Sequence, residues 1–295
     1  GSFGAAAAVG SALDLPVAEM RYALAIVASG SSALKKNFGS MTKPLHPGHA
    51  AQVGVRAAFL AADGFTGDES ILDGEMGYGM VMSPAGDYDT GEITEGLGET
   101  WAITDIGYKP YPSGVITHAA MDALRDIVVD EDLAPEDVDR VVVTLDEAAS
   151  SMLIHADAGN ALQAKFSIEF CLASVLRARD PGVREFSDEY VTEPETRAAM
   201  ELVERDFEEN LFGDDYAGYG GRVVVETTGG ERYENEERRA PGGPNNPVSE
   251  ERLRGKFFEC AETVFDRDDA EELCDAVESL GEDGSLARFV AVARP

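Results

Sequence analysis

The spacing of apolar positions divides the chain into a helical beginning, a mixed middle part and a helical end. Residues 1–64 carry Ala-rich apolar stretches without strand-like alternation, and glycines and prolines punctuate them. The pattern predicts helices over 3–13, 16–28 and 49–62 and a loop over 37–48. Residues 68–104 are less regular, and short helices are expected there.

After Lys109 the pattern changes to alternating helices and strands. The prolines at positions 110 and 112 predict a turn before a helix that Thr117 caps. The elements that follow are a strand over 138–145, helices over 162–177 and 194–207, and a hairpin over 222–236. This part is consistent with a second, compact α/β domain.

Residues 241–247, rich in Pro, Gly and Asn, predict a linker. Beyond it Ser249 caps a helix with Glu250 and Glu251 in its first turn, where the helix dipole favours acids. A further helix over 270–280 shows a clean apolar face. We therefore place domain boundaries so that the parts are 1–104, 105–244 and 245–295.

The charge of the chain excludes several classes of partner. Acidic residues outnumber Lys and Arg by 56 to 24, which gives a net charge of −32. A surface of this kind lacks the basic face that nucleic acid or an anionic membrane requires, so neither is expected as a partner. No apolar run reaches the length of a membrane helix, and we predict no signal peptide. A globular cytoplasmic protein is expected, since hydrophobic residues make up 44% of the chain.

Lysine is scarce, and the 56 acidic residues are spread along the whole length. This composition favours a halophilic protein that works in concentrated salt, where repulsion between carboxylates is screened. An ordinary acidic cytosolic enzyme is the alternative. The 3 cysteines and 4 histidines are dispersed without ligand spacing, so no metal site and no disulfide framework are predicted. There is also no Walker-type loop, GxGxxG, GxSxG or HExxH motif.

The most informative stretch is 39–51, which places Lys43, His46 and His49 in a loop that leads into a helix. Free backbone N–H groups at a helix start favour an anion, and a lysine with two imidazoles adds charge and proton-transfer capacity. The alternative is a surface loop with a capping role.

A second stretch, 108–120, repeats this composition. Lys109 lies in a proline turn and His118 in the first turn of the following helix. A domain-boundary turn with His118 on the helix surface is the alternative. A third stretch, 164–171, contains Lys165 and Phe170, and core packing with Lys165 extended toward water is the alternative there.

At these stretches the sequence resembles the MmgE/PrpD family, which includes 2-methylcitrate dehydratase and cis-aconitate decarboxylase. The resemblance rests on five groups of residues in the family's order. They are Gly1–Ala8, Thr42–Ala51 with Gly64-Phe-Thr-Gly67, Lys109-Pro-Tyr-Pro112 with Thr117-His118, Ala164-Lys-Phe-Ser167, and Asn246-Pro-Val-Ser249 with Lys256-Phe257.

The resemblance implies a mainly α fold, in which an all-helical domain built from residues 1–104 and 245–295 carries an inserted α+β lid. It also implies a cofactor-independent lyase for a small di- or tricarboxylate, which abstracts a proton next to a carboxylate and then releases water or carbon dioxide. Lys43 and Lys109 match active-site lysines of the family. They would converge on a cleft, bind substrate carboxylates and stabilise an enolate-like intermediate. His46, His49 and His118 are candidates for orientation or proton transfer, and a homodimer is expected.

Three departures from the family limit this prediction. The chain starts where the first third of the family's members has ended, and that third carries an Asp and a His of the pocket. Gly114 stands where decarboxylase-like members have a His. Phe170 aligns with a tyrosine of the family's pocket and is a candidate for substrate binding, but it lacks the hydroxyl for hydrogen bonding or proton delivery. The first hypothesis is therefore a 2-methylcitrate dehydratase of propionate metabolism, as a piece of a longer enzyme or completed by a separate chain. The alternatives are aconitate decarboxylation or epimerisation, and a non-catalytic family member.

Overall fold

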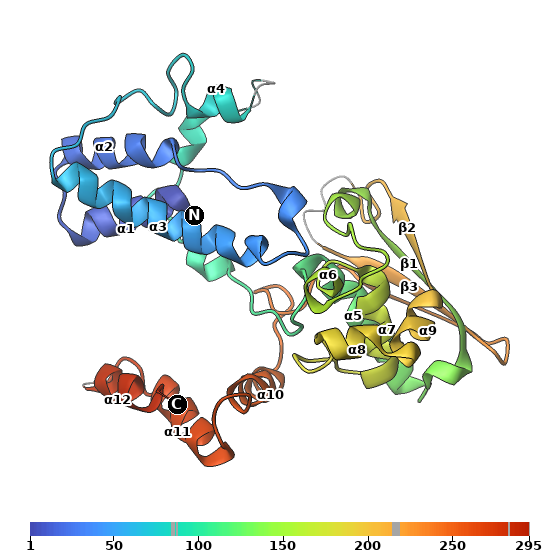
Figure 1. The fold of residues 1–295 in the computed structure, drawn as a ribbon. Coiled ribbons are helices and arrows are strands. Elements are labelled where there is room, and N and C mark those ends of the chain that lie inside the picture. The colour runs from blue at the N-terminus through green and yellow to red at the C-terminus, as the bar shows by residue number, and fades with distance from the viewer. Residues whose placement is uncertain (84–85, 87, 214–218, 283, 295) are drawn as a thin grey trace. The chain divides into compact units, whose positions relative to one another are not determined.

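A computed structural model describes residues 1–295 except 84–85, 87, 214–218, 283 and 295. Its internal contacts divide the chain into two compact units, Gly1–Ala102 and Ile103–Pro295. The first unit is helical, and the second combines helices with a small mixed sheet (Figure 1). The predicted fold class, mainly α with an α/β part, is thus confirmed. The division lies close to the predicted boundary at 104, whereas the return of 245–295 to the helical domain stays a prediction.

The first unit is built on three packed helices, α1 (Ser2–Ala12), α2 (Val17–Ala28) and α3 (Thr42–Ala62). Small side chains allow the helices to approach closely: Ala6, Val27 and Ala57 form their buried core. At Gly54 of α3 an added Cβ would lie 2.7 Å from the Ser2 carbonyl oxygen of α1, so no larger residue fits there without a shift. Short helices in this unit are η1 (Lys35–Asn37), α4 (Tyr78–Met82) and η2 (Thr90–Ile93), and η3 (Ala102–Asp105) runs across the division into the second unit.

The predicted loop over 37–48 is wrong in its second half, because α3 begins at Thr42 and continues through Pro44 and Pro47. Pro44 falls in the first turn, where the missing N–H has no intrahelical acceptor to lose. Pro47 is inside the helix and removes one backbone hydrogen bond. Packing of the long C-terminal part of α3 against α1 and α2 offsets that loss.

The sheet of the second unit consists of β1 (Val138–Asp146), β2 (Val203–Glu208), β3 (Gly221–Thr227) and β4 (Arg232–Glu237). Its order is β2-β1-β3-β4, with β2 parallel to β1 and the other pairs antiparallel. The predicted hairpin is confirmed as β3 and β4. The predicted helix over 194–207 is wrong at its end: α9 (Pro194–Glu201) stops, and the next residues pair with β1. Pairing with a distant strand overrides the local pattern there.

Two helices cover the sheet, α5 (Val115–Asp130) and α7 (Ile168–Ala178), and they also pack on each other (Figure 1). The predicted helix over 162–177 is divided. The short α6 (Ala161–Ala164) ends before Lys165, and Ser167 caps α7 by accepting from the Phe170 N–H at 3.1 Å. Other short helices in this unit are η4 (Pro135–Asp137), η5 (Glu147–Ser151) and α8 (Asp188–Thr192).

The C-terminal helices are α10 (Glu250–Ala261), α11 (Arg267–Glu278) and α12 (Ser285–Val292). The predicted cap is confirmed, since Ser249 Oγ accepts from the Arg252 N–H at 3.2 Å. This cap fixes where α10 begins and therefore which side chains share each of its faces. Within the described part of the chain, every helix is too short or too polar to cross a lipid bilayer.

Candidate functional site

The first unit places Lys43, His46 and His49 on the first turns of α3 rather than in a loop. Lys43 and His46 are half-buried, and His49 is exposed. Side chains three residues apart are neighbours on a helix surface, so His46 lies next to both Lys43 and His49 on this helix. Their arrangement combines one ammonium group with two imidazoles at the positive end of a helix, which suits an anion.

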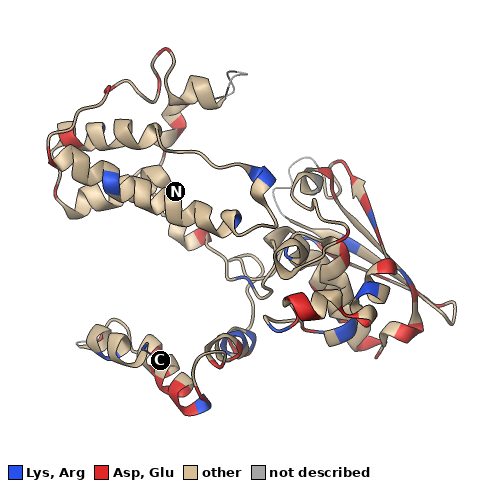
Figure 2. Cartoon of the chain, in the orientation of Figure 1, with Lys and Arg blue, Asp and Glu red and all other residues tan. Residues whose placement is uncertain are grey.

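The sequence around this group contains no carboxylate from position 20 to position 62. Lys35, Lys36 and Lys43 fall within this stretch, whose ribbon is blue or tan in Figure 2. None of the three forms an ion pair with a carboxylate among the described residues. A local excess of positive charge therefore exists within a protein of net charge −32.

The second unit brings together two of the predicted stretches, the turn after Lys109 and the segment around Lys165. The Lys109 ammonium donates to the Ser113 carbonyl at 3.2 Å, and the Ser113 and Thr117 hydroxyls are 2.8 Å apart. The Gly114 N–H donates to the Lys165 carbonyl at 2.9 Å. The proline turn is thus fixed both to the start of α5 and to the α6–α7 connection.

His118 lies beside this turn and is completely buried, so the alternative of a helix-surface histidine is wrong. Burial, with a smaller contribution from the Lys109 ammonium, lowers the pKa of His118 to about 3. The Ser113 carbonyl opposes this shift, although neither ring nitrogen has a hydrogen bond of normal geometry among the described residues. The imidazole is therefore neutral at pH 7, and the Tyr111 ring packs edge-on to it at 5.4 Å.

A pocket of about 380 Å³ opens beside the Lys109 turn. Lys109 and Arg239 supply two positive charges to its lining, and Asp105 supplies one negative charge. Backbone of the 240–246 linker forms another part of its wall, where the Tyr108 N–H donates to the Gly242 carbonyl at 2.8 Å. A small anion with one or two carboxylates fits the size and charge of this pocket.

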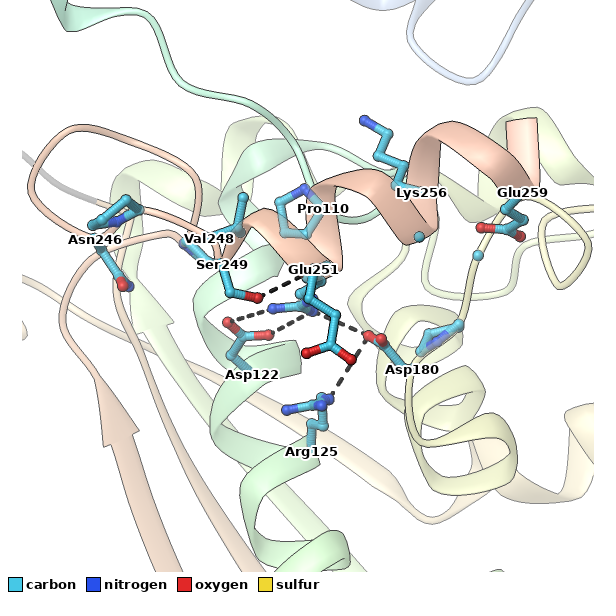
Figure 3. Close-up of a pocket in the computed structure, with 16 residues that line it drawn as sticks. Pro110, Asp122, Arg125, Asp180, Asn246, Val248, Ser249, Glu251, Lys256 and Glu259 are labelled. Atoms are coloured by element: carbon cyan, nitrogen blue, oxygen red, sulfur yellow. Dashed lines mark hydrogen bonds and ion pairs between the residues drawn. The ribbon is translucent and has the colours of Figure 1, made fainter. Parts of the chain in front are cut away.

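A second pocket, of about 660 Å³, lies between α10, α5 and the residues after α7 (Figure 3). Its centre is an ion-pair cluster in which Arg252 contacts Asp122 and Asp180, each at 3.1 Å. Since carboxylates neutralise the guanidinium, this pocket is less suited to an anion than the one beside Lys109. We therefore take the Lys109 pocket as the candidate site in this unit.

The remaining predicted site residue, Phe170, lies in the core of the second unit. It is fully buried, with Phe186 at 5.1 Å and Tyr190 at 6.4 Å between ring centroids. The structure thus brings Lys109 and His118 together and places Phe170 among aromatic rings. Lys43, His46 and His49 belong to the other unit, and their convergence with Lys109 on one cleft stays a prediction.

Sequence reasoning missed three cationic side chains near the Lys109 turn: Arg239, Arg252 and Lys256. Lys256 donates to the Lys109 backbone carbonyl, and Arg252 lies over the Tyr111 ring at 4.8 Å. Lysine scarcity was a usable signal for Lys256. No local pattern points to Arg252, because its partners Asp122 and Asp180 are far away in sequence. Among the described residues, no group of three or more His, Cys, Asp or Glu side chains is arranged to hold a metal ion.

The chain is similar to several proteins named cis-aconitate decarboxylase. The chain is 28% identical to cis-aconitate decarboxylase of Mus musculus and 27% identical to that of Homo sapiens, over 95% of this chain in each case. It is 26% identical to the cis-aconitate decarboxylase of Aspergillus terreus (strain NIH 2624 / FGSC A1156) over 93% of this chain. The alignments span only 58%, 58% and 59% of those proteins.

Two family models match the chain and together cover most of it. The MmgE/PrpD N-terminal domain matches residues 1–90, and the MmgE/PrpD C-terminal domain matches residues 111–282. Lys43 on α3 falls within the first match, and Lys109 lies two residues before the second, in the two units that the contacts separate. The matches do not support the prediction that the chain lacks the first third of the family's length. The N-terminal match falls in the helical first unit and the C-terminal match in the α/β second unit. This chain belongs to the MmgE/PrpD family.

Proposed function

We propose that the chain carries the substrate-binding lysines of a cofactor-independent lyase for a small di- or tricarboxylate. The observation that carries the proposal is the pocket beside Lys109, in which two cations face one carboxylate within a strongly acidic protein. A polyanion is repelled by the rest of such a surface, so a local cationic site is required to hold it. Membership of the MmgE/PrpD family supports a lyase, and so does the similarity to proteins named cis-aconitate decarboxylase.

In the proposed reaction, Lys43 and Lys109 bind carboxylates of the substrate. A base removes a proton from the carbon next to a carboxylate, and the two ammonium groups stabilise the enolate-like charge that develops. In a dehydration, the electron pair then forms a carbon–carbon double bond while the hydroxyl leaves, protonated, as water. His46 and His49 are accessible on α3 and suit the proton transfers, whereas the buried, neutral His118 suits the support of the Lys109 turn.

The specific reaction that we propose is dehydration of 2-methylcitrate. Gly114 precedes α5, and its N–H donates to the Lys165 carbonyl. It has no side chain, whereas the resemblance implies a His at this position in decarboxylase-like members. That absence argues against the decarboxylase. Decarboxylation of cis-aconitate is the second candidate, because the relatives are named for it.

Turnover of both acids by the native, full-length protein in concentrated salt tests the proposal. We expect conversion of 2-methylcitrate to an unsaturated product, followed by ultraviolet absorbance and mass spectrometry, and little release of carbon dioxide from cis-aconitate. Lys43→Ala and Lys109→Ala should each reduce kcat/KM by about 100-fold, the order of effect for losing a charged transition-state contact. Lys36→Ala, an exposed lysine outside the site, is the control and should retain most activity. Failure of the native protein to convert either acid would refute the proposal.

A further inference from the structure

Helix α10 presents one polar face to the α/β part of its own unit. Arg252, Lys256 and Glu259 are spaced at i, i+4 and i+7, so they lie on one side of the helix. Each of them contacts a different segment. Arg252 binds Asp122 of α5, Lys256 binds the backbone before the proline turn, and Glu259 accepts from the Val183 N–H at 2.7 Å.

Arg252 makes the most extensive of these contacts. Its two terminal nitrogens donate to the two carboxylate oxygens of Asp122 at 3.1 and 3.4 Å, and one of them also donates to Asp180 at 3.1 Å. Its guanidinium lies 4.8 Å from the centre of the Tyr111 ring. The Tyr111 hydroxyl in turn donates to Asp122 at 2.5 Å. Arg252, Asp122 and Tyr111 therefore form a closed triangle of contacts.

This triangle holds the middle of the turn that carries Lys109. Tyr111 is the third residue of the Lys109-Pro-Tyr-Pro turn and is only 1% exposed. Lys256 fixes the start of the turn through the Lys109 carbonyl, and Ser113 fixes its end through the Lys109 ammonium. A change at Arg252 would thus be transmitted through Tyr111 to the position of the Lys109 ammonium.

We propose that Arg252 is a positioning residue that sets the Lys109 ammonium for carboxylate binding by holding Tyr111 and Asp122. This inference depends on one part of the proposed function, namely that Lys109 binds a polycarboxylate. Arg252 does not line the Lys109 pocket and acts through the turn. Its ion pairs do not by themselves imply a gain in stability, because desolvation offsets much of the attraction within a partly buried pair.

The test is the affinity of the native protein for tricarballylate, a tricarboxylate without a hydroxyl group to eliminate, measured by isothermal titration calorimetry. Arg252→Lys keeps the charge but cannot bind both Asp122 oxygens in a planar fork or stack in the same way on Tyr111. We expect a loss of about 10-fold in affinity, since small displacements of a binding group have effects of this size or larger. Arg254→Lys is the matched control, because Arg254 is on the same helix and pairs with Glu278 of α11 instead.

A double-mutant cycle separates positioning from general destabilisation. If Arg252 acts through Lys109, Arg252→Lys has no further effect on affinity in a Lys109→Ala background. Equal losses in both backgrounds would overturn the proposal, and so would an unchanged affinity in the single variant. Tyr111→Phe, which keeps the ring and removes only the hydroxyl bond to Asp122, tests the same link should Arg252→Lys fold poorly. We expect it to weaken binding about 3-fold, again only when Lys109 is present.

An NMR signal supplies a second readout. The Tyr111 ring lies edge-on to His118, so movement of Tyr111 changes the chemical shift of the His118 Cε1–H. This resonance is assigned as the one that is missing from the spectrum of the His118→Gln variant. Arg252→Lys should shift this resonance and Arg254→Lys should not, and an unmoved resonance in the first variant would overturn the proposal. Absence of tricarballylate binding by the native protein would overturn it as well. Binding without turnover of either acid would instead refute only the proposed reaction.

Discussion

The buried imidazole of His118 makes the stability of the second unit depend on pH in a calculable way. Burial lowers its pKa from the ordinary value of 6.5 to about 3 in the folded protein. Between these two values the unfolded chain binds a proton that the folded chain does not bind. Above pH 6.5 the neutral imidazole therefore does not reduce the free energy of unfolding. As the pH falls from 6.5 toward 3, the free energy of unfolding decreases, because protonation of His118 favours the unfolded chain.

The magnitude at pH 5 follows from the unfolded pKa alone, as long as the folded value lies well below 5. A difference of 1.5 pH units at 1.36 kcal/mol per unit gives a loss of about 2 kcal/mol at pH 5. Replacing His118 with Gln removes this titration. The Gln variant loses the ring contact with Tyr111, so we expect it to be less stable than the native protein at pH 8.

Urea denaturation of both proteins between pH 8 and pH 5, followed by circular dichroism and by hydrogen exchange in α5 and β1, measures the effect. The difference in free energy of unfolding between the two proteins should change by about 2 kcal/mol over this range, in favour of the variant at low pH. Carboxylates titrate in both proteins, so their contributions cancel in the difference. A difference that stays constant from pH 8 to pH 5 would show that His118 is protonated as easily in the folded as in the unfolded chain.

Two further predictions concern packing. Gly54→Ala places a Cβ 2.5 Å from the Ala5 Cβ and should destabilise the first unit by about 1–3 kcal/mol. The control is Gly48→Ala, whose Cβ meets nothing within 4 Å and which should be neutral or stabilising. Urea denaturation measures the free energy of unfolding of both variants. Cys171 is fully buried with its pKa raised to about 12, and Cys260 is exposed. Under native conditions iodoacetamide should modify Cys260 and leave Cys171 intact, as judged by mass spectrometry, and equal labelling would contradict the buried position.

Local sequence signals predicted most of the helices, because caps and apolar spacing act over a few residues. Ser249 before α10 and the turn between β3 and β4 are of this kind. The errors arose where distant contacts decide the structure. Residues after 202 form β2 only because β1 is available to pair with them, and α3 tolerates Pro47 because its later turns pack against two other helices.

The candidate site shows the same division between local and distant information. The turn at Lys109 and the helix position of His118 could be predicted from the two nearby prolines. The predicted Thr117 cap is wrong, because α5 begins at Val115 after Gly114 and Thr117 lies inside its first turn, where its hydroxyl donates to the Gly114 carbonyl at 3.0 Å. That His118 is buried could not, because its cover includes the Tyr111 ring and side chains on several elements. Arg252 and Asp122 are separated by 130 positions, and no short-range pattern connects them.

The distribution of positive charge explains why a rigid turn matters in this protein. Most arginines pair with carboxylates, whereas Lys35, Lys36 and Lys43 lie in a stretch without any acidic residue. At an ionic strength of about 0.1 M such a stretch attracts polyanions over a distance of about 10 Å. If the prediction of a high-salt environment is correct, that range falls to about 3 Å, so attraction at a distance contributes little. Substrate must then be held by direct contacts, whose strength depends on accurate placement of each ammonium group. The contacts that hold the Lys109 turn through Arg252, Lys256 and Ser113 provide that placement in the second unit.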